Sequence, residues 1–277
     1  MMIKDILLKL PLFALIVLII SCNKQTPNQS DKVVVEALLF AGETVDDVNL
    51  TKLLAYGGED TIPKPINDAE VSITWNNKTF ELTNSSDTGS YHYPFADLKI
   101  EEGELYQLNV NHAGFEISSF TICPPKPSLP TITKDTLKIE LFSILDSLFT
   151  GGNTEIPDPD SVVVEWANPN NEYYFVVAEN VEQVKENIYP EFLGLIGDFF
   201  FQTSPTQASR YVFTDLDFRH FGRHEIRIYK VNQEYVDLYQ SYEQDSRTQA
   251  EPITNVFNGL GIFTAVNYST VDLFVTK

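Results

Sequence analysis

Apolar and polar side chains alternate along much of this chain, the pattern of β-strands with one face buried and the other in water. Residues 69–75 alternate in this way, Asn76-Asn77 follows as a turn, and residues 78–83 return with the same alternation. Residues 104–110 and 115–122 form a second such pair around a short turn that contains glycine. Both pairs are typical of β-hairpins.

Further strands extend these hairpins into a unit at residues 32–123. Residues 32–40 are almost continuously apolar, which favours a strand that is covered on both faces or has a barely exposed outer face. Residues 48–54 and 90–93 predict two more short strands between turn segments. We therefore expect residues 32–123 to form a β-sandwich of the Ig-like or transthyretin-like kind.

A proline-rich segment at residues 124–130 divides the chain. Proline stiffens the backbone and cannot donate to a strand ladder, so we expect a linker between two domains here. Beyond it, residues 162–166 and 173–177 predict two strands, with Trp166 as a core anchor. Their spacing predicts a fibronectin type III-like sandwich over residues 131–277, and hence a mainly β fold of two β-sandwich domains.

Helical character is limited to the second half of the chain. Asn232 is a good N-cap for a helix over about residues 232–247. Apolar side chains recur there at helical spacing, which predicts a helix that packs on a sheet. Residues 181–201 predict an insertion of helical or irregular character.

The start of the chain predicts export and lipid attachment. Basic residues lead into an apolar run that ends at Ser21-Cys22, the order of a bacterial lipoprotein signal. We expect residues 1–21 to be a lipoprotein signal peptide, Cys22 to carry the lipid, and residues 22–31 to be a flexible leash. The alternative is an ordinary secretory signal. Residues 23–25 lack an acidic run, which favours the periplasmic face of the outer membrane over the cell surface.

The net charge limits which partners the chain can bind, and the cysteine content limits its disulfide bonds. The formal net charge is −20, which argues against nucleic acid and against anionic lipid headgroups. The chain has two cysteines, and with Cys22 lipidated Cys123 has no partner, which excludes a disulfide framework.

No residue pattern spells out a reaction, so we expect no catalytic residues, no cofactor and no enzyme. His220 and His224 lie four residues apart, but the flanking arginines oppose a cation and Gly222 interrupts the strand. Two Asp-x-Asp clusters, at residues 158–160 and 215–217, lack the register of a calcium loop and predict solvated turns. We therefore expect no metal site.

Two sets of residues are candidates for contacts outside the chain. Phe199, Phe200 and Phe201 are adjacent and cannot all face one core, so they are a candidate partner surface; the alternative is a loop that plugs the end of the second sandwich. A repeated Asp-Ser/Thr-aliphatic pattern resembles the O-glycosylation acceptor of Bacteroidota periplasmic proteins. The candidate acceptors are Thr61, Thr136, Ser147 and Ser161.

Six elements occur in a fixed order along the chain: Cys22 and residues 32–36, 65–71, 89–91, 106–110 and 255–263. Taken together and in this order, they resemble the DUF4249 lipoproteins of Bacteroidota. Asn258 stands where we expect glycine in many relatives. The resemblance implies a cell-envelope lipoprotein that accompanies outer-membrane TonB-dependent receptors, and it supplies no catalytic residues.

These observations favour a non-enzymatic accessory that is anchored to the outer membrane and binds a TonB-dependent receptor or its substrate. One alternative is a glycan- or peptide-acting hydrolase with acidic residues facing each other between the domains. A second is a purely structural envelope protein.

Overall fold

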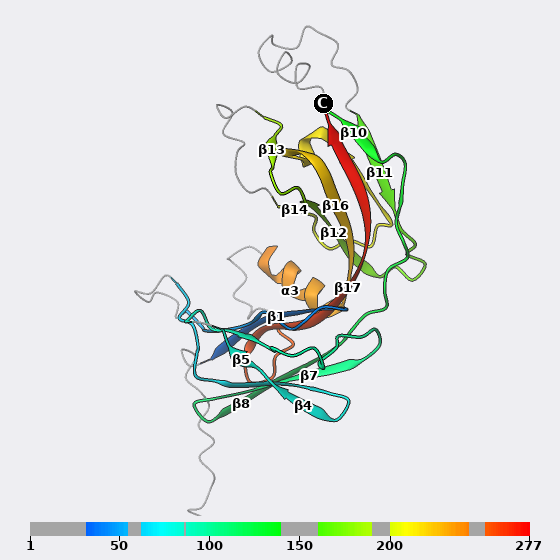
Figure 1. The fold of residues 1–277 in the computed structure, drawn as a ribbon. Coiled ribbons are helices and arrows are strands. Elements are labelled where there is room, and N and C mark those ends of the chain that lie inside the picture. Colours follow the sequence, from blue (N-terminus) through cyan, green and yellow to red (C-terminus); the bar gives the residue numbers. More distant parts are fainter. Residues whose placement is uncertain (1–31, 55–61, 86, 140–159, 190–199, 244–252) are drawn as a thin grey trace, which may run out of the picture.

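The computed structural model describes residues 32–54, 62–85, 87–139, 160–189, 200–243 and 253–277 (Figure 1). Three sheets of ten, four and three strands account for most of these residues, which confirms a mainly β fold. Two stacked units are visible in Figure 1, an N-terminal unit at the bottom and a C-terminal unit at the top.

The N-terminal unit is a sandwich whose two sheets enclose one hydrophobic cluster. The two predicted hairpins form its four-stranded sheet, in the order β4-β3-β7-β8. Asn76 and Asn77, with φ angles of 51° and 61°, form the turn of the first hairpin. The strands of this sheet are β3 (Glu70–Trp75), β4 (Lys78–Glu81), β7 (Leu105–His112) and β8 (Phe115–Ile122), and those of the facing sheet include β1 (Val33–Phe40), β2 (Val48–Lys52), β5 (Thr83–Asn84) and β6 (Ser90–His92).

The C-terminal unit has the strand order of a fibronectin type III sandwich. One sheet runs β15-β11-β9 and faces the strands β14-β12-β16-β17. Trp166 is 5% exposed and its ring lies 5.8 Å from that of Tyr174, which confirms it as a core anchor. The elements are β9 (Thr131–Ile132), β10 (Thr136–Lys138), β11 (Ser161–Glu165), β12 (Tyr173–Asn180), β13 (Glu186–Asn187), β14 (Phe201–Gln202), β15 (Arg210–Thr214), η3 (Asp215–Asp217), β16 (His220–Val231) and β17 (Leu260–Thr276).

The strand β17 belongs to both units. Its first part, Leu260 to Val266, pairs in parallel with β1, and its second part, Asn267 to Val275, pairs antiparallel with β16. The ten-stranded sheet therefore continues from one unit into the other (Figure 1). Phe263 and Ala265 pack in the N-terminal cluster although the sequence placed them in the unit at 131–277.

The proline-rich segment lies against this shared strand. Asn267 Nδ2 donates to the Pro124 carbonyl at 3.0 Å, and Ser269 Oγ donates to the Pro127 carbonyl at 2.7 Å. Prolines leave their carbonyls free to accept, so polar side chains of a buried strand can fix the segment. The division into consecutive domains at residues 124–130 stays a prediction.

The helix α3 (Gln233–Glu243) confirms the helix predicted at residues 232–247 as far as Glu243; residues 244–247 lie outside the described part. Val236 is 1% exposed, and the Tyr235 ring stacks on Phe175 at 5.4 Å, so the helix packs on the sheet as expected. It is not long and apolar enough to cross a membrane, nor is any other helix in the described part of the chain.

Glycine is required where β17 starts. Gly261 has a φ of 95°, and a Cβ atom there would lie 1.9 Å from the carbonyl oxygen of Val35 on β1. Asn258, with a φ of 59°, adopts the left-handed conformation at the position where the sequence analysis expected glycine. The segment is thus a structural turn that brings β17 against β1.

Replacing Gly261 with alanine is expected to destabilise the protein by about 3 kcal/mol or more, because the new methyl group meets backbone and the φ angle is unfavourable. Gly42→Ala is the matched control, since Gly42 also has a positive φ, 80°, but has no atom within 4 Å of the added Cβ. Denaturant unfolding of both variants measures the difference. Equal losses would contradict the close approach of the two strands.

Candidate ligand-binding face

The outer face of the four-stranded sheet is the strongest candidate site. On β7, the side chains of Gln107, Asn109 and Asn111 point outward because they alternate with the buried residues Tyr106, Leu108 and Val110. Each of these amides lies opposite residues of the neighbouring strands, so the side chains form three rows across the sheet. The rows are Glu70-Asn111-Glu116, Glu81-Ser72-Asn109-Ser118 and Thr79-Thr74-Gln107-Phe120.

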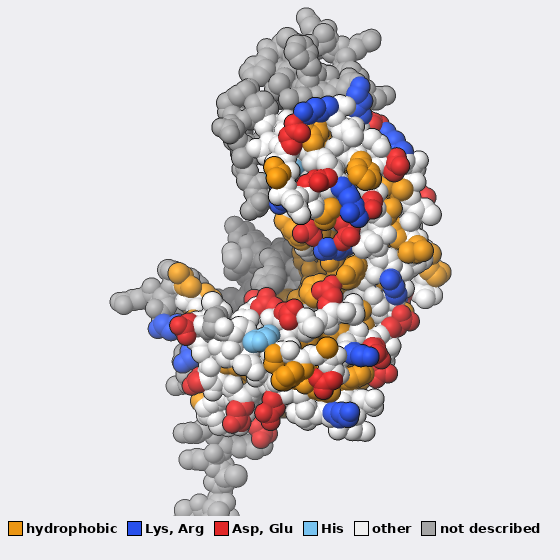
Figure 2. All heavy atoms as spheres, in the orientation of Figure 1, with side chains coloured by type: hydrophobic (Ala, Val, Ile, Leu, Met, Phe, Trp, Pro, Cys, Tyr) orange, Lys and Arg blue, Asp and Glu red, His pale blue; other side chains and the backbone are white. Residues whose placement is uncertain are grey.

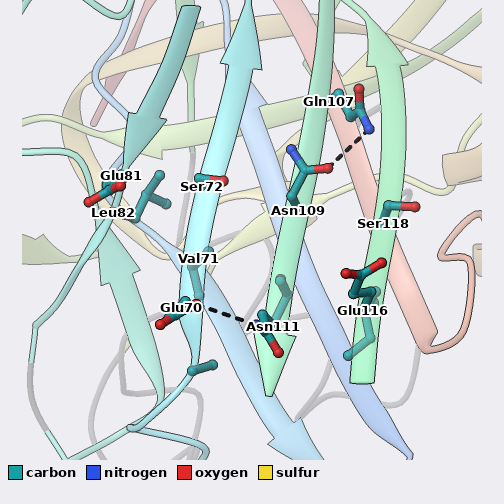
Figure 3. A pocket seen from close by; sticks show the side chains of 13 residues that line it. Glu70, Val71, Ser72, Glu81, Leu82, Gln107, Asn109, Asn111, Glu116 and Ser118 are labelled. Carbon is teal, nitrogen blue, oxygen red and sulfur yellow. Dashed lines mark hydrogen bonds between the residues drawn. The ribbon is translucent and has the colours of Figure 1, made fainter. Parts of the chain in front are cut away.

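A groove of about 840 Å³ is lined by the first two rows and by Gln107 of the third, and Figure 3 shows the three amides in line along one strand. Gln107 Nε2 donates to Asn109 Oδ1 at 3.0 Å, and Asn109 Nδ2 donates to Thr74 Oγ1 at 3.2 Å. Asn111 Nδ2 donates to a carboxylate oxygen of Glu70 at 3.4 Å. These contacts hold the amides in place and leave acceptor oxygens on Gln107 and Asn111 with no donor among the described residues.

Exposed apolar side chains border the polar groove. Phe120 is 71% exposed and lies in register with Gln107. Phe257 is 69% exposed, and its backbone bridges that of Ser118, with N···O distances of 3.2 Å and 2.7 Å, so it extends the edge of the sheet beyond β8. Leu105 and Ile122, which pair with each other, continue the apolar border. Large exposed apolar groups beside a polar groove are typical of a contact surface.

The groove is acidic. Glu70, Glu81 and Glu116 line it, and the described lining residues include no lysine or arginine. Figure 2 shows acidic and hydrophobic side chains together on the visible face of the N-terminal unit. The electrostatic field of these carboxylates opposes an anionic ligand.

A second hollow of about 450 Å³ lies where the two units meet, lined by Ile122, Cys123 and Pro124 from one unit and by Glu172 and Lys230 from the other. Lys230 is 7% exposed, and its Nζ lies 2.6 Å from Glu172 Oε2, so the two charges form a mostly buried pair. Glu172 is the one carboxylate among the described residues of this lining. The hydrolase alternative expects two carboxylates here and stays an untested prediction.

The structure separates the members of the predicted aromatic triplet. Phe201 packs against Tyr211 and Phe213, with ring centroids 5.4 Å and 5.3 Å away. Phe200 is 61% exposed, and Phe199 lies outside the described residues. One ring thus belongs to the core of the C-terminal unit, and its neighbour, just before the start of β14, faces solvent.

Two of the four candidate glycosylation sites lie in described segments. Thr136 on β10 and Ser161 on β11 are both exposed. Asp160 accepts hydrogen bonds from the backbone N–H groups of Lys138 and Ser161. These bonds place β10, which carries Thr136, near the start of β11, which carries Ser161. Thr61 and Ser147 lie outside the described residues, as does the predicted lipidation site Cys22.

Cys123 is fully buried. Burial, with a contribution from Glu102, raises the pKa of its thiol to about 11, so the thiol stays protonated near neutral pH. It acts as a small apolar core residue at the end of β8.

His220 and His224 are both buried on β16. His224 Nδ1 lies 3.1 Å from the Gly222 carbonyl, and the Phe218 ring packs 4.8 Å away. Burial lowers the pKa of His224 to about 4, with a smaller effect of His220 in the same direction, while Gly222 and Glu182 oppose the shift. Within the described ranges, no group of three or more His, Cys, Asp or Glu side chains could hold a metal ion.

His224 makes stability depend on pH. The unfolded chain takes up a proton near the ordinary pKa of 6.5, whereas the folded chain does so near 4, so stability is full above pH 6.5 and is lost as pH falls towards 4. The loss from this residue is about 3 kcal/mol. We expect His224→Gln, which keeps a donor and an acceptor, to lose less stability over this range in denaturant titrations. Parallel losses in both chains would contradict a buried neutral imidazole.

The sequence analysis did not identify the groove. Its signal was present, because Gln107, Asn109 and Asn111 fill the outward positions of β7 and Phe120 fills an outward position of β8. A phenylalanine at a solvent-facing position of a hairpin, opposite an amide, indicates a contact surface.

The fold and this face define a class: a two-sandwich protein with a fibronectin type III-like second unit and an amide-lined sheet face on the first. The chain belongs to the DUF4249 family, described as a domain of unknown function, whose profile matches residues 23–272. No curated protein matches the sequence.

Solved structures similar to this chain include a two-domain fibronectin type III segment from chicken tenascin. That likeness has 10% identity, a TM-score of 0.21, and coverage of 72% of this chain and 89% of the other. A segment of titin domains is similar at 10% identity and a TM-score of 0.19, with coverage of 88% and 66%. The assignment of the sandwich therefore rests on the strand order described above.

Proposed function

We propose that this chain is a lipid-anchored protein of the outer membrane, facing the periplasm, that acts as a non-enzymatic accessory. It binds a TonB-dependent receptor or that receptor's substrate on the outer face of the sheet β4-β3-β7-β8. The observation that carries the proposal is the groove of about 840 Å³ lined by fixed amides and bordered by exposed aromatic rings.

The proposed anchor fits the position of the face. Residues 22–31 would tether the first strand, β1, which belongs to the same unit as the groove. Ten extended residues reach at most about 35 Å, so the face would stay close to the membrane surface. Several acyl chains on one cysteine would hold the protein there almost permanently.

The charge supports a protein or uncharged ligand as the partner. With a net charge of −20, the chain is repelled by nucleic acid and by anionic headgroups. The membrane contact is therefore expected to come from lipid on Cys22 and not from a basic surface.

The lipid anchor is tested by replacing Cys22. The Cys22→Ala chain is expected to escape acylation and to keep its signal peptide, giving a longer chain than wild type. Cys123→Ala is the matched control and is expected to be acylated and processed normally. Mass spectrometry of the purified chains measures both outcomes. Acylation of the Cys22→Ala chain would contradict the proposal.

The partner is tested by affinity capture from outer membranes solubilised in detergent. Wild type is expected to recover a β-barrel receptor, and Asn111→Ala with Phe120→Ala is expected to recover several-fold less, because the exposed groups of the face are removed. Leu216→Ala, which changes a side chain that is 64% exposed on the other unit, is the control and should recover as much as wild type. Recovery of the chain alone at every salt concentration would count against the accessory role.

A further inference from the structure

We infer that the groove on the outer face of β4-β3-β7-β8 is a saccharide site that takes a neutral oligosaccharide. This inference rests on the proposed function, since it names the chemical class of the ligand that the binding face holds. It uses the amides, the borders and the charge of the groove, which point to the same ligand.

The lining selects a polyhydroxylated ligand. Pockets of several hundred Å³ for drug-like molecules are mostly apolar, whereas the outward side chains of this groove are amides, hydroxyls and carboxylates. A side-chain amide both donates and accepts, and so does a sugar hydroxyl. Gln107, Asn109 and Asn111 repeat this capacity at every second residue of β7, which spaces them about 7 Å apart along an extended ligand.

The amides are held in place before a ligand arrives. The contacts from Gln107 to Asn109 and from Asn109 to Thr74 fix their planes, so little side-chain freedom remains to be lost on binding. The oxygens of Gln107 and Asn111 that have no donor among the described residues can accept from hydroxyl groups.

Aromatic rings at the border supply the second element of sugar recognition. One face of a pyranose ring presents C–H groups, which pack on the face of an aromatic ring. Phe120 stands in the same row as Gln107, so a ligand that contacts the amide also reaches the ring. Phe257 extends this border past the backbone bridge at Ser118. A phenylalanine that is 71% exposed leaves its ring free for such a contact.

The charge of the groove decides between kinds of polar ligand. Glu70, Glu81 and Glu116 repel sulfated, phosphorylated or uronic sugars, and the described lining offers no lysine or arginine to hold them. A cationic peptide would be attracted as well, and its backbone could pair with the amides and its cationic side chains with the Phe120 ring. The octalysine probe in the test below distinguishes such a peptide from a neutral sugar. The hydroxyl groups of a neutral sugar donate to the carboxylates and pair with the amides, and its C–H face packs on the Phe120 ring.

The test uses the full chain, purified in a detergent without a sugar headgroup. The probes are neutral linear hexasaccharides of glucose, mannose, galactose and xylose, with an oligogalacturonate and an octalysine peptide as the charged arms. Titration calorimetry is expected to show binding of at least one neutral hexasaccharide, about tenfold weaker for Phe120→Ala and for Asn111→Ala. Both residues are exposed, so the variants should fold, and circular dichroism checks this. Leu216→Ala, on the other unit, should bind as wild type does.

Failure of every neutral hexasaccharide to bind, binding that both face variants retain, or binding of a charged probe alone would each overturn the saccharide site. The capture experiment separates this failure from that of the accessory role. If receptor recovery depends on Phe120 while no neutral sugar binds, the face holds a protein and the saccharide inference is wrong. If a sugar binds through Phe120 but no receptor is recovered, the site stands and its association with the receptor does not.

Discussion

The two units depend on a single strand that both of them use. β17 is 17 residues long, and its first eight residues are all buried. That stretch pairs with β1 in the sheet and is covered on both faces. The later residues alternate between buried and exposed, as in a strand that is covered on one face. β17 is continuous and pairs with β1 in one part and with β16 in the other, so its backbone hydrogen bonds connect the two units.

Polar groups also connect the two units at a joint, the region where α3, the end of β8 and β17 meet. Glu234 on α3 accepts hydrogen bonds from Thr121 and Thr264, each at 3.0 Å, and Asn232 donates to the Ile122 carbonyl at 2.9 Å. These contacts tie the start of the helix, the end of β8 and the shared strand together. Buried polar groups that are fully satisfied fix one arrangement, because any displacement leaves donors and acceptors unpaired. The groove begins on the same strand, β8, so the joint also orients the candidate site.

The sequence predicted those strands, turns and helices that are specified by residues close together in the chain. The two hairpins follow from alternation around a turn, and the strands on either side of residues 167–172 follow from their apolar runs. The helix followed from its cap and spacing. The shared strand could not be predicted, because β1 and β17 pair across more than two hundred residues and local patterns do not specify such a contact. The almost continuous apolar run at residues 32–40 indicated that β1 is covered but not what covers it.

The candidate site shows the same limit. Periodicity predicted the hairpin of β7 and β8 and placed its polar residues in solvent. It does not show that three amides and a phenylalanine lie together on one face of the sheet. The aromatic triplet attracted attention because its residues are adjacent, yet Phe201 faces the core and Phe200 does not. A functional surface on a sheet is a set of residues in register on different strands. Adjacency along the chain is a poor guide to it.

The central claim, that the shared strand makes the two units one cooperative body, can be tested with the two tryptophans of the chain. Trp75 lies in the N-terminal unit and Trp166 in the C-terminal unit, so Trp75→Phe and Trp166→Phe each leave one fluorescent reporter. Within each variant, the fluorescence midpoint in denaturant is expected to coincide with the midpoint of the whole chain measured by circular dichroism. Two steps in the circular dichroism, with each tryptophan following a different one, would contradict the account.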